Sequence, residues 1–505
     1  MKVAIYASEV IPYAKTGGLA DVAGALPAYL NKLGIESILF MPLYREVRRK
    51  NLPLKKIIEK GEFEWAGSLG REARGDHSSP AGRSARTSYE KASFSLWEHD
   101  AGSFRACFVE NDAYFDRDFL YGTPAGDYPD NGERFGFFSR AALESLKILD
   151  FRPHILHCHD WQSAMALAYL QFIYPNDPFF REVRSLFTIH NLAYQGLFDK
   201  SILPTIGLPE SLFNMNDLEF YGKVNFLKAG ILYSTAVSTV SPRYSREIQT
   251  PEMGFGLDGL LRSRSSVLHG VLNGVDYDHW NPRTDTLIPA NFGPGDLGGK
   301  QVCKKGLLEA FQLPDSPSPV VGMVSRLAGQ KGLDIVCEAL KGIFALGVKL
   351  VVLGTGEEKI HELLKEAQKD YPDQLGLKIA FDERLAHMIY AGSDIFLIPS
   401  RYEPCGLTQM YSLKYGTIPV VRATGGLDDS IREFDPGTQS GNGFKFEDYS
   451  AVALTGSLKK AVDLVRQPRI WGALVRNAMA CDFSWERAAG NYVELFKKIS
   501  SPSSS

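Results

Sequence analysis

The chain has 505 residues, and its first segment with evident chemistry is a glycine-rich turn beside a lysine. Lys15 precedes Thr16, Gly17 and Gly18, and a predicted helix begins at the second glycine. Glycines let backbone N–H groups approach a ligand, and the helix N-terminus adds partial positive charge to that of the lysine. The segment is neither a Walker loop nor a GxGxxG fingerprint. We therefore expect a phosphate-binding turn, with a plain strand-to-helix turn as the alternative.

A pair of cations follows a predicted strand in the second half of the chain. Arg326 and Lys331 are five positions apart and come after the strand predicted at Val320–Val324. Parallel α/β sheets bind ligands at the carboxyl ends of their strands. Arginine can clamp phosphate oxygens bidentately, and lysine supplies a point charge. The pair suits a diphosphate, although a solvated loop with two surface cations is the commoner situation.

An acidic residue follows a later strand of the same half. Glu403 comes after the strand predicted at Asp394–Pro399 and just before a helix expected from about Gly406. Its carboxylate could accept hydrogen bonds from a sugar, or it could only complement the helix dipole. Cys405 is interpreted as a packing thiol, because no base is paired with it.

Histidine, aspartate and asparagine end two neighbouring strands of the first half. His157, His159 and Asp160 close one strand, and His190 and Asn191 close the next. The first two histidines share a strand face, but no third ligand has convincing metal spacing, so we expect no metal. Hydrogen bonding to a polyhydroxyl ligand suits the other three residues better. A buried histidine with its hydrogen bonds satisfied remains the alternative for the first.

The elements that must position these residues alternate between short β-branched runs and longer helical periods, which is typical of an α/β protein with parallel sheets. Strands are predicted at Val3–Ala7, Ser37–Pro42, Ala106–Val109, Ile155–His159, Ser185–Ile189, Ala236–Val240, Val320–Val324, Lys349–Leu353, Lys378–Phe381, Asp394–Pro399 and Pro419–Arg422. Helices are predicted at Gly18–Leu33, with Leu33 on its apolar face, and at Leu333–Ala345, Glu357–Lys369 and Ser484–Ile499. We expect two domains, 1–268 with 484–505 packed back on it, and 269–483.

Composition places few other constraints on function. The net charge is −3, with 44% apolar and 23% charged residues, so nothing favours nucleic acid or an anionic membrane as a partner. Six scattered cysteines without a CxxC pair, and no long apolar stretch, predict a cytoplasmic protein. Ser68–Ser93 is rich in Gly, Ser and Arg, and we expect a flexible surface insertion without an assigned role.

Seven segments in order along nearly the whole chain are similar to bacterial glycogen synthases and plant starch synthases. They are Lys15–Asp21, His157–Trp161, His190–Gly196, Asn273–Asp276, Ser325–Leu327 with Gln330–Gly332, Glu403–Gln409 and Thr424–Leu427. The resemblance implies the glycosyltransferase B fold, in which two Rossmann-like domains face a cleft and close on the donor. Among the differences, Tyr402 stands where the family usually has Phe.

The resemblance also implies a reaction. Glucose would pass from ADP-glucose to the non-reducing 4-hydroxyl of an α-1,4-glucan, glycogen or maltodextrin, with retention of configuration and without cofactor or metal. Lys15, His190, Arg326, Lys331 and Glu403 would be catalytic. The cations would stabilise the leaving diphosphate, the glutamate would hold glucosyl hydroxyls, and His190 would lie near the reacting carbon. Substrate-binding positions implied by the resemblance are Gly17, Gly18, Asp21, Asp160, Asn191, Gly354, Cys405, Gly406, Leu407, Thr408, Thr424, Gly425 and Gly426.

Three other functions remain open on the sequence alone. An α-glucan phosphorylase would share the fold but use pyridoxal phosphate. A silent glucan- or nucleotide-sugar-binding protein is disfavoured by the joint presence of Lys15, Arg326, Lys331 and Glu403. A nicotinamide dehydrogenase lacks its GxGxxG support. The choice between ADP-glucose and UDP-glucose, the oligomeric state, allosteric control and the group that deprotonates the acceptor also stay open.

Overall fold

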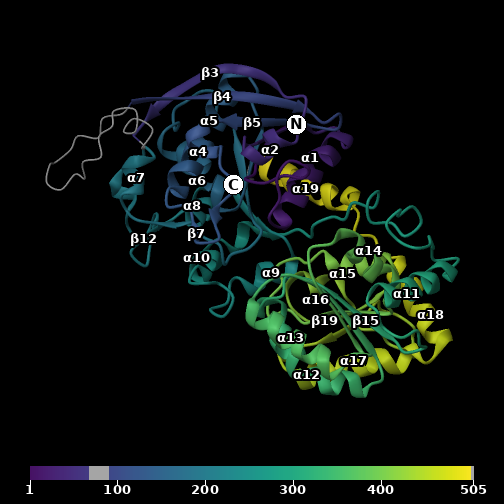
Figure 1. The fold of residues 1–505 in the computed structure, drawn as a ribbon. Helices are drawn as coiled ribbons and strands as arrows, with labels where there is room; N and C mark the ends of the chain where they lie inside the picture. The colour runs from purple at the N-terminus through teal and green to yellow at the C-terminus, as the bar shows by residue number, and fades with distance from the viewer. Residues whose placement is uncertain (67–89, 502–505) are drawn as a thin grey trace. The chain divides into compact units, whose positions relative to one another are not determined.

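The computed structural model describes residues 1–66 and 90–501, which divide into two compact units (Figure 1). Unit 1 comprises Met1–Thr239, Ser245–Val271 and Ala488–Ser505, and unit 2 comprises Val240–Tyr244 and Leu272–Arg487. Most of the insertion predicted at Ser68–Ser93 lies outside the described residues. Its last four residues belong to a strand that begins at Glu90, so the predicted insertion extends too far.

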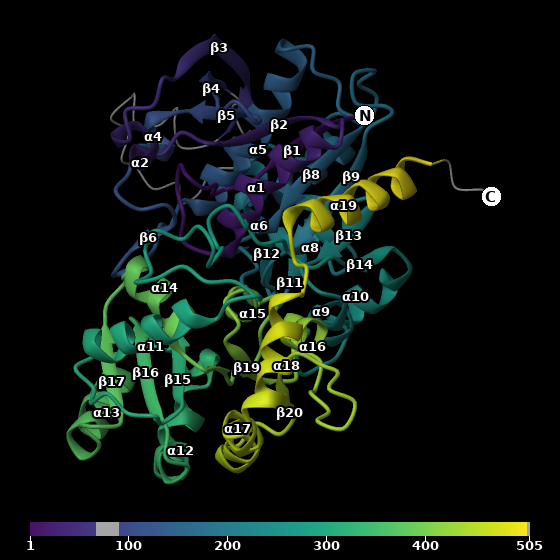
Figure 2. The same cartoon turned by 90° about the vertical axis from the view of Figure 1, so that its right-hand side faces the viewer.

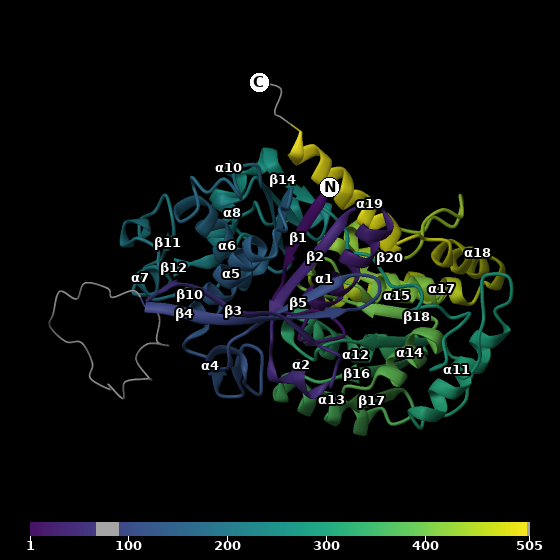
Figure 3. The same ribbon diagram turned by 90° about the horizontal axis from the view of Figure 1, so that it is seen from above.

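Unit 1 is built on a nine-stranded sheet in the order β14-β13-β9-β8-β1-β2-β5-β4-β3. Pairing is parallel from β14 to β5, whereas β4 is antiparallel to both β5 and β3. Figure 3 shows β3 and β4 side by side at one edge of this sheet. The strands are β1 (Lys2–Tyr6), β2 (Glu36–Pro42), β3 (Lys55–Trp65), β4 (Glu90–Asp100), β5 (Arg105–Glu110), β8 (Ile155–His159), β9 (Arg184–Ile189), β13 (Ala236–Thr239) and β14 (Leu268–Gly270).

Helices cover the sheet of unit 1, and its central strands are accordingly buried along almost their whole length. The longer helices are α1 (Gly18–Lys32), α5 (Asn131–Ile148), α6 (Asp160–Phe172), α8 (Phe226–Tyr233) and α19 (Trp485–Ser500). The C-terminal helix α19 lies against the sheet of this unit (Figure 2). Its Tyr492 and Phe496 rings contact the His157 ring of β8 at centroid distances of 5.5 and 5.6 Å.

Shorter elements fill the connections of unit 1 and include two small sheets, β10-β12-β11 and β6-β7. They are α2 (Arg45–Arg49), α4 (Asp112–Phe115), β6 (Gly122–Thr123), β7 (Gly126–Asp127), β10 (Leu197–Phe198), α7 (Ile202–Thr205), β11 (Glu219–Phe220), β12 (Lys223–Asn225), α9 (Pro242–Glu247, which begins in unit 2) and α10 (Asp258–Ser263).

Unit 2 is built on a six-stranded parallel sheet in the order β17-β16-β15-β18-β19-β20. Its strands are β15 (Val320–Val324), β16 (Lys349–Gly354), β17 (Leu375–Ile379), β18 (Ile395–Ile398), β19 (Ile418–Arg422) and β20 (Phe444–Phe446). Its helices are α11 (Gly298–Ala310), α12 (Leu333–Ala345), α13 (Glu358–Asp370), α14 (Glu383–Gly392), α15 (Thr408–Lys414), α16 (Gly425–Ser430), α17 (Ala451–Val465) and α18 (Pro468–Met479).

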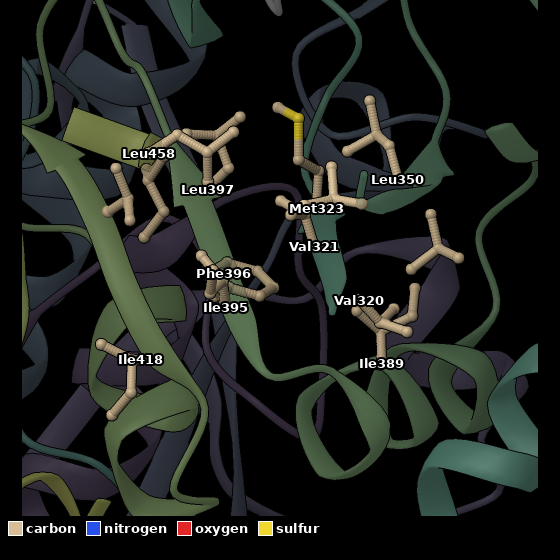
Figure 4. Packing of buried hydrophobic residues seen from close by; sticks show 14 of the residues in the cluster. Val320, Val321, Met323, Leu350, Ile389, Ile395, Phe396, Leu397, Ile418 and Leu458 are labelled. Carbon is tan, nitrogen blue, oxygen red and sulfur yellow. The ribbon is translucent and has the colours of Figure 1, made fainter. Parts of the chain in front are cut away.

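The core of unit 2 forms where helices pack on the two central strands. Figure 4 shows Val321 and Met323 of β15, Phe396 of β18 and Ile389 of α14 within one cluster of apolar side chains. All four are buried. These strands are near-continuous β-branched or apolar runs, which is the pattern of strands covered on both faces.

Each sheet reverses its strand order at one place. In unit 1 the chain runs from β1 toward β2 on one side, and from β8 toward β9 on the other. In unit 2 it runs from β15 toward β16 on one side, and from β18 toward β19 on the other. Ligands of open α/β sheets bind beyond the carboxyl ends of the strands at such a switch point. The segments after β1, β8, β15 and β18 are therefore the places to look for a site.

The structure confirms most of the predicted elements and corrects several. Ten of the eleven predicted strands agree to within about two residues at either end, whereas β17 begins and ends earlier than Lys378–Phe381. Leu33 caps α1 and is 48% exposed, so it does not belong to the buried face. The β3–β4 hairpin was not predicted. None of the described helices is long and apolar enough to cross a membrane.

Candidate functional site

At the switch point of unit 2, a lysine and a glutamate from different loops form an ion pair. The Lys331 Nζ atom lies 2.6 Å from Oε2 of Glu403. The Ser400 hydroxyl donates to the same carboxylate oxygen at 2.9 Å. Both charged side chains are largely shielded, with 20% and 10% of their surfaces exposed. The structure thus brings together two of the residues expected to be catalytic.

Backbone contacts between the two loops fix this pair. Gly332 has φ of +77°, and a Cβ at this position would lie 2.1 Å from the carbonyl oxygen of Pro399. The Arg401 N–H donates to the Gln330 carbonyl at 2.9 Å. A glycine is therefore required next to Lys331, because only glycine allows this approach and this backbone conformation.

Arg326 lies in the same loop after β15 but faces solvent. Its Nη2 atom donates to Oε1 of Gln330 at 3.0 Å, and no contact with Glu403 is present among the described residues. The loop is held against the end of β16, where a Cβ on Gly354 would lie 1.9 Å from the Ser325 carbonyl oxygen. Gly354 therefore has a packing role in addition to any contact with a ligand.

The glycine-rich turn at Thr424–Gly426 packs on the segment that carries Glu403. A Cβ on Gly425 would lie 1.9 Å from the Glu403 carbonyl oxygen, and one on Gly426 would lie 2.0 Å from that of Cys405. Gly425 also has φ of +46°, a backbone conformation that favours glycine. These glycines let α16 approach the loop after β18 closely.

Helix α15 begins at Thr408 and not at about Gly406 as predicted. Gly406 has φ of +69° and Leu407 is the N-cap, so the helix cannot start earlier. Burial raises the pKa of Cys405 to about 12. The thiol therefore stays protonated near neutral pH, in agreement with a packing role and not with a nucleophile.

In unit 1 the Lys15 loop follows β1. The Lys15 Nζ atom lies 2.8 Å from Oδ1 of Asp21, on the first turn of α1. Two backbone N–H groups of the loop, those of Thr16 and Gly17, donate to the Glu9 carboxylate, the second at 3.0 Å. These two donors are thus occupied by the protein itself, which qualifies the expectation that the loop presents free N–H groups to phosphate.

Glu9 is a residue that the sequence analysis missed. It is 5% exposed and also accepts hydrogen bonds from the Thr16 hydroxyl at 3.0 Å and from the Tyr121 hydroxyl at 3.2 Å. A buried carboxylate with several donors holds the loop in one conformation. The available signal was an acidic residue directly after an apolar strand, at the position where a parallel sheet binds ligands.

The segment after β8 places Asp160 against the segment after β9. Asp160 has φ of +55°, an uncommon conformation for a residue other than glycine. Its Oδ1 atom accepts the His190 backbone N–H at 2.7 Å, and its carboxylate also accepts the Asn191 N–H. Burial, with a smaller contribution from the nearby Glu9 carboxylate, raises the pKa of Asp160 to about 7, although the two backbone hydrogen bonds act to lower it.

Three histidines lie together beside this aspartate. The His159 Nδ1 and His190 Nε2 atoms are 2.9 Å apart, and His157 Nε2 lies 2.7 Å from the Thr188 hydroxyl. Burial lowers the pKa of His157 and of His190 to about 3 and that of His159 well below its usual value, so all three are neutral. Within residues 1–66 and 90–501 they form no group of three potential metal ligands with suitable geometry.

Comparison with known proteins agrees with this arrangement. Residues 2–263 match the family model described as the starch synthase catalytic domain, and residues 308–476 match that of glycosyl transferases group 1. The chain is 46% identical to a glycogen synthase of Koribacter versatilis over 501 residues, covering 99% of this chain and 98% of the relative. It is 44% identical to a glycogen synthase of Thermosipho melanesiensis over 503 residues, covering 99% of both.

Solved structures give the same result for the fold. The catalytic domain of starch synthase IV from Arabidopsis thaliana, bound to ADP and acarbose, superposes with a TM-score of 0.85 at 32% identity and covers 99% of each chain. A sucrose-phosphate synthase from Thermosynechococcus elongatus, at 15% identity and a TM-score of 0.58, shares the fold alone. The glycosyltransferase B fold implied by the sequence is therefore confirmed, and the phosphorylase, dehydrogenase and silent-binder alternatives are set aside. The chain belongs to the glycogen synthase and starch synthase family of glycosyltransferases.

Proposed function

We propose that this enzyme transfers a glucosyl unit from ADP-glucose to the 4-hydroxyl at the non-reducing end of an α-1,4-glucan, with retention of configuration. The observation that carries this proposal is the Lys331–Glu403 ion pair at the switch point of unit 2. The Lys331 ammonium suits a departing diphosphate, and the Glu403 carboxylate suits sugar hydroxyls. The starch synthase IV relative, whose structure holds ADP and acarbose, supports the choice of donor and acceptor.

In this proposal, unit 2 holds the donor. Departure of ADP places negative charge on the β-phosphate oxygens, and fixed cations stabilise charge that grows in the transition state. Lys331 is already held by Glu403, whose carboxylate also accepts the Ser400 hydroxyl, so little reorganisation is needed when the charge develops. Arg326 is exposed and free to turn toward the diphosphate once its contact with Gln330 is exchanged.

Glu403 has two roles in the proposed reaction. Its carboxylate orients Lys331, and its remaining acceptor capacity can bind glucosyl hydroxyls, since an ionised carboxylate offers about four acceptor sites. The proposed substrate-binding loop continues from Glu403 through Cys405, Gly406, Leu407 and Thr408. The Thr424–Gly426 turn packs on this loop. The proposal requires this loop to stay rigid.

Unit 1 is proposed to serve the acceptor and the reacting carbon. A neutral His190 can hydrogen-bond a sugar without adding charge, and its backbone is fixed by Asp160. Lys15, held by Asp21 and by the Glu9-braced loop, would contribute a further cation to the phosphates. Asn191 would be positioned by the same aspartate.

We further propose that the enzyme acts in the cytoplasm. Its six cysteines are all free thiols, which suits a reducing compartment. The relatives reported above include bacterial glycogen synthases.

Initial rates of glucosyl transfer to glycogen, measured separately with ADP-glucose and UDP-glucose, test the proposal. We expect transfer from ADP-glucose at the higher kcat/KM, and we expect an α-1,4-specific exo-amylase to release all of the newly transferred glucose from the outer chains. Faster transfer from UDP-glucose would overturn the donor assignment, and retention of the transferred glucose after this digestion would overturn the linkage.

A further inference from the structure

Two histidines and a glutamate of unit 2, none of them assigned to the reaction, come together. They are His279, Glu383 and His387, and one potential ligand atom of each lies within 4.8 Å of the other two. His279 Nε2 is 3.2 Å from Oε1 of Glu383. Glu383 and His387 are four positions apart on α14, so they share one face of that helix. Within residues 1–66 and 90–501, this is the group with metal-ligand geometry.

His387 is prepared for a ligand in a way that an ordinary buried histidine is not. Its Nδ1 atom lies 2.7 Å from Oδ2 of Asp285, which also accepts the Tyr415 hydroxyl at 2.6 Å. The Nε2 atom is buried and has no hydrogen-bond partner among the described residues.

The ring that carries this nitrogen is also fixed in orientation. Trp280 stacks on His387 with the ring centroids 4.0 Å apart and an angle of 12° between the planes. The neighbouring His279 ring is 5.1 Å from it, in an edge-to-face arrangement. A buried, unpartnered imidazole nitrogen costs free energy unless a partner is supplied.

We propose that His279, Glu383 and His387 bind a divalent transition-metal ion, with Zn²⁺ as the favoured ion. Two imidazoles and one carboxylate match the ligand preference of Zn²⁺ and its neighbours and not that of Mg²⁺ or Ca²⁺, which prefer oxygen ligands. A metal-ligating histidine typically donates its other ring N–H to a carboxylate. Asp285 provides that acceptor and leaves Nε2 of His387 to face the metal.

The observed separations require only a small adjustment. Zn–N and Zn–O bonds of about 2.0–2.2 Å place neighbouring ligand atoms of a tetrahedron roughly 3.3–3.6 Å apart. The contact of 3.2 Å between His279 and Glu383 is already close to this value. These two side chains are 47% and 61% exposed, so they are free to rotate toward the fixed His387. Water would complete the coordination.

The ion would have a structural role. It would join His279, in the segment before α11, to helix α14, in addition to the Asp285–His387 pair and the stacking of Trp280 on His387. The site has no residue in common with Arg326, Lys331 or Glu403, so a test of metal binding does not depend on the proposed transfer reaction. Binding to the folded state alone raises stability by mass action.

A direct test uses the full-length protein, stripped of metal by chelation and gel filtration and carrying no affinity tag. Co²⁺ is titrated in and followed by its visible absorption, and the thermal unfolding midpoint is measured with and without Zn²⁺. We expect one equivalent of Co²⁺ to bind with a tetrahedral spectrum, and Zn²⁺ to raise the midpoint. Glu383→Gln and His279→Ala should each weaken binding at least about tenfold. Both positions are exposed, so the variants are expected to fold.

Glu358→Gln is the matched control. Glu358 Oε2 lies 3.3 Å from His361 Nδ1, one turn along α13, and its carboxylate is 77% exposed. This pair has the same chemistry but no third ligand within the described residues. The control should bind as the unsubstituted protein does. Equal binding in all variants would assign the metal to other groups such as thiols, and the absence of a saturable first equivalent would exclude the site; either result overturns the proposal.

Discussion

The ammonium nitrogen of Lys331 lies 2.6 Å from a carboxylate oxygen of Glu403, although the two residues are 72 positions apart in the chain. The contact exists because β15 and β18 are neighbours in the sheet and Gly332 approaches Pro399 closely. Each of the two charges therefore compensates the other in a largely shielded environment. Changes to either one should affect the partner, and the predictions below separate that structural effect from a chemical one.

The first prediction concerns Glu403. Glu403→Gln keeps the size of the side chain and its hydrogen bond from Ser400, but removes the charge that orients Lys331. We expect transfer to fall at least about tenfold while affinity for free ADP changes less than about threefold, because the nucleotide is proposed to contact the cations and not this carboxylate. Calorimetry with ADP and initial-rate kinetics measure the two effects. If the kinetics are unchanged and stability falls by only about 0.3–1 kcal/mol, the one role left for Glu403 is to complement the helix dipole.

The second prediction concerns Gly425. An alanine Cβ would lie 1.9 Å from the Glu403 carbonyl oxygen, and the backbone φ of +46° is unfavourable for alanine. Gly425→Ala should lower the free energy of unfolding by more than about 1 kcal/mol and reduce transfer, because the loop after β18 must shift. Urea unfolding and kinetics test this.

Gly456→Ala is the control for that substitution. Gly456 lies within α17, and a Cβ there would meet nothing within 4 Å. This variant should gain up to about 1 kcal/mol of stability and keep full activity. Equal effects of the two substitutions would contradict the packing role assigned to the Thr424–Gly426 turn.

The third prediction concerns Asp160. Its pKa is about 7 in the folded protein, mainly through burial, whereas an unfolded aspartate has a pKa of about 3.9. The raised folded-state pKa contributes stability below about pH 4, and this contribution is lost as pH rises through about 7. Asp160→Asn should remove that loss, which amounts to about 4 kcal/mol. Asparagine also accepts N–H groups and tolerates the positive φ.

Urea unfolding at about pH 5 and about pH 8 measures the effect. We expect the variant to gain stability relative to the unsubstituted protein at the higher pH and to gain less at the lower one. Parallel pH dependences for the two proteins would show that Asp160 titrates normally.

The fourth prediction concerns Glu9. Glu9→Ala leaves the Thr16 and Gly17 N–H groups without their acceptor, so we expect a stability loss of about 1–3 kcal/mol and lower transfer activity. The specific readout is amide hydrogen exchange, which should accelerate at these two residues. The Val10 and Ala14 amides, which pair with each other's carbonyls, should stay protected and serve as the internal control. Acceleration at all four would indicate general unfolding of the segment.

The sequence predicted where the chemistry-bearing residues stand along the elements. The strand Val320–Val324 is a short run of mostly β-branched or apolar residues that ends at a polar residue, and that local pattern is sufficient. The contact between Lys331 and Glu403 could not be predicted from spacing. It depends on strand order in the sheet, which is a property of tertiary packing.

The elements and residues that were predicted wrongly or not at all also depend on tertiary packing. The run around Lys378 is apolar without clear alternation, so its register was ambiguous, and Phe381 proves to be 95% exposed. In β3 and β4, buried residues such as Phe63 and Phe94 alternate with more exposed ones. The two strands are separated in the sequence by residues 67–89, so the sequence did not indicate that they pair. His387 acquires its role from Asp285, which is distant in sequence, and Glu9 acquires its role from the nearby Thr16–Gly17 turn together with the distant Tyr121.

The central claim is that Lys331 stabilises the departing diphosphate, and one comparison tests it most directly. Lys304 forms a matched ion pair with Asp394 in the same unit, with an Nζ to Oδ2 distance of 2.7 Å and side-chain exposures of 14% and 12%. Transfer of labelled glucose from ADP-glucose to glycogen is measured for Lys331→Ala and Lys304→Ala, with thermal unfolding of both. Removing a charge partner of this kind costs about 2–5 kcal/mol, so Lys331→Ala should lose at least about tenfold in kcat/KM while Lys304→Ala loses stability but retains turnover. A folded Lys331→Ala enzyme with the turnover of the unsubstituted protein would contradict the claim.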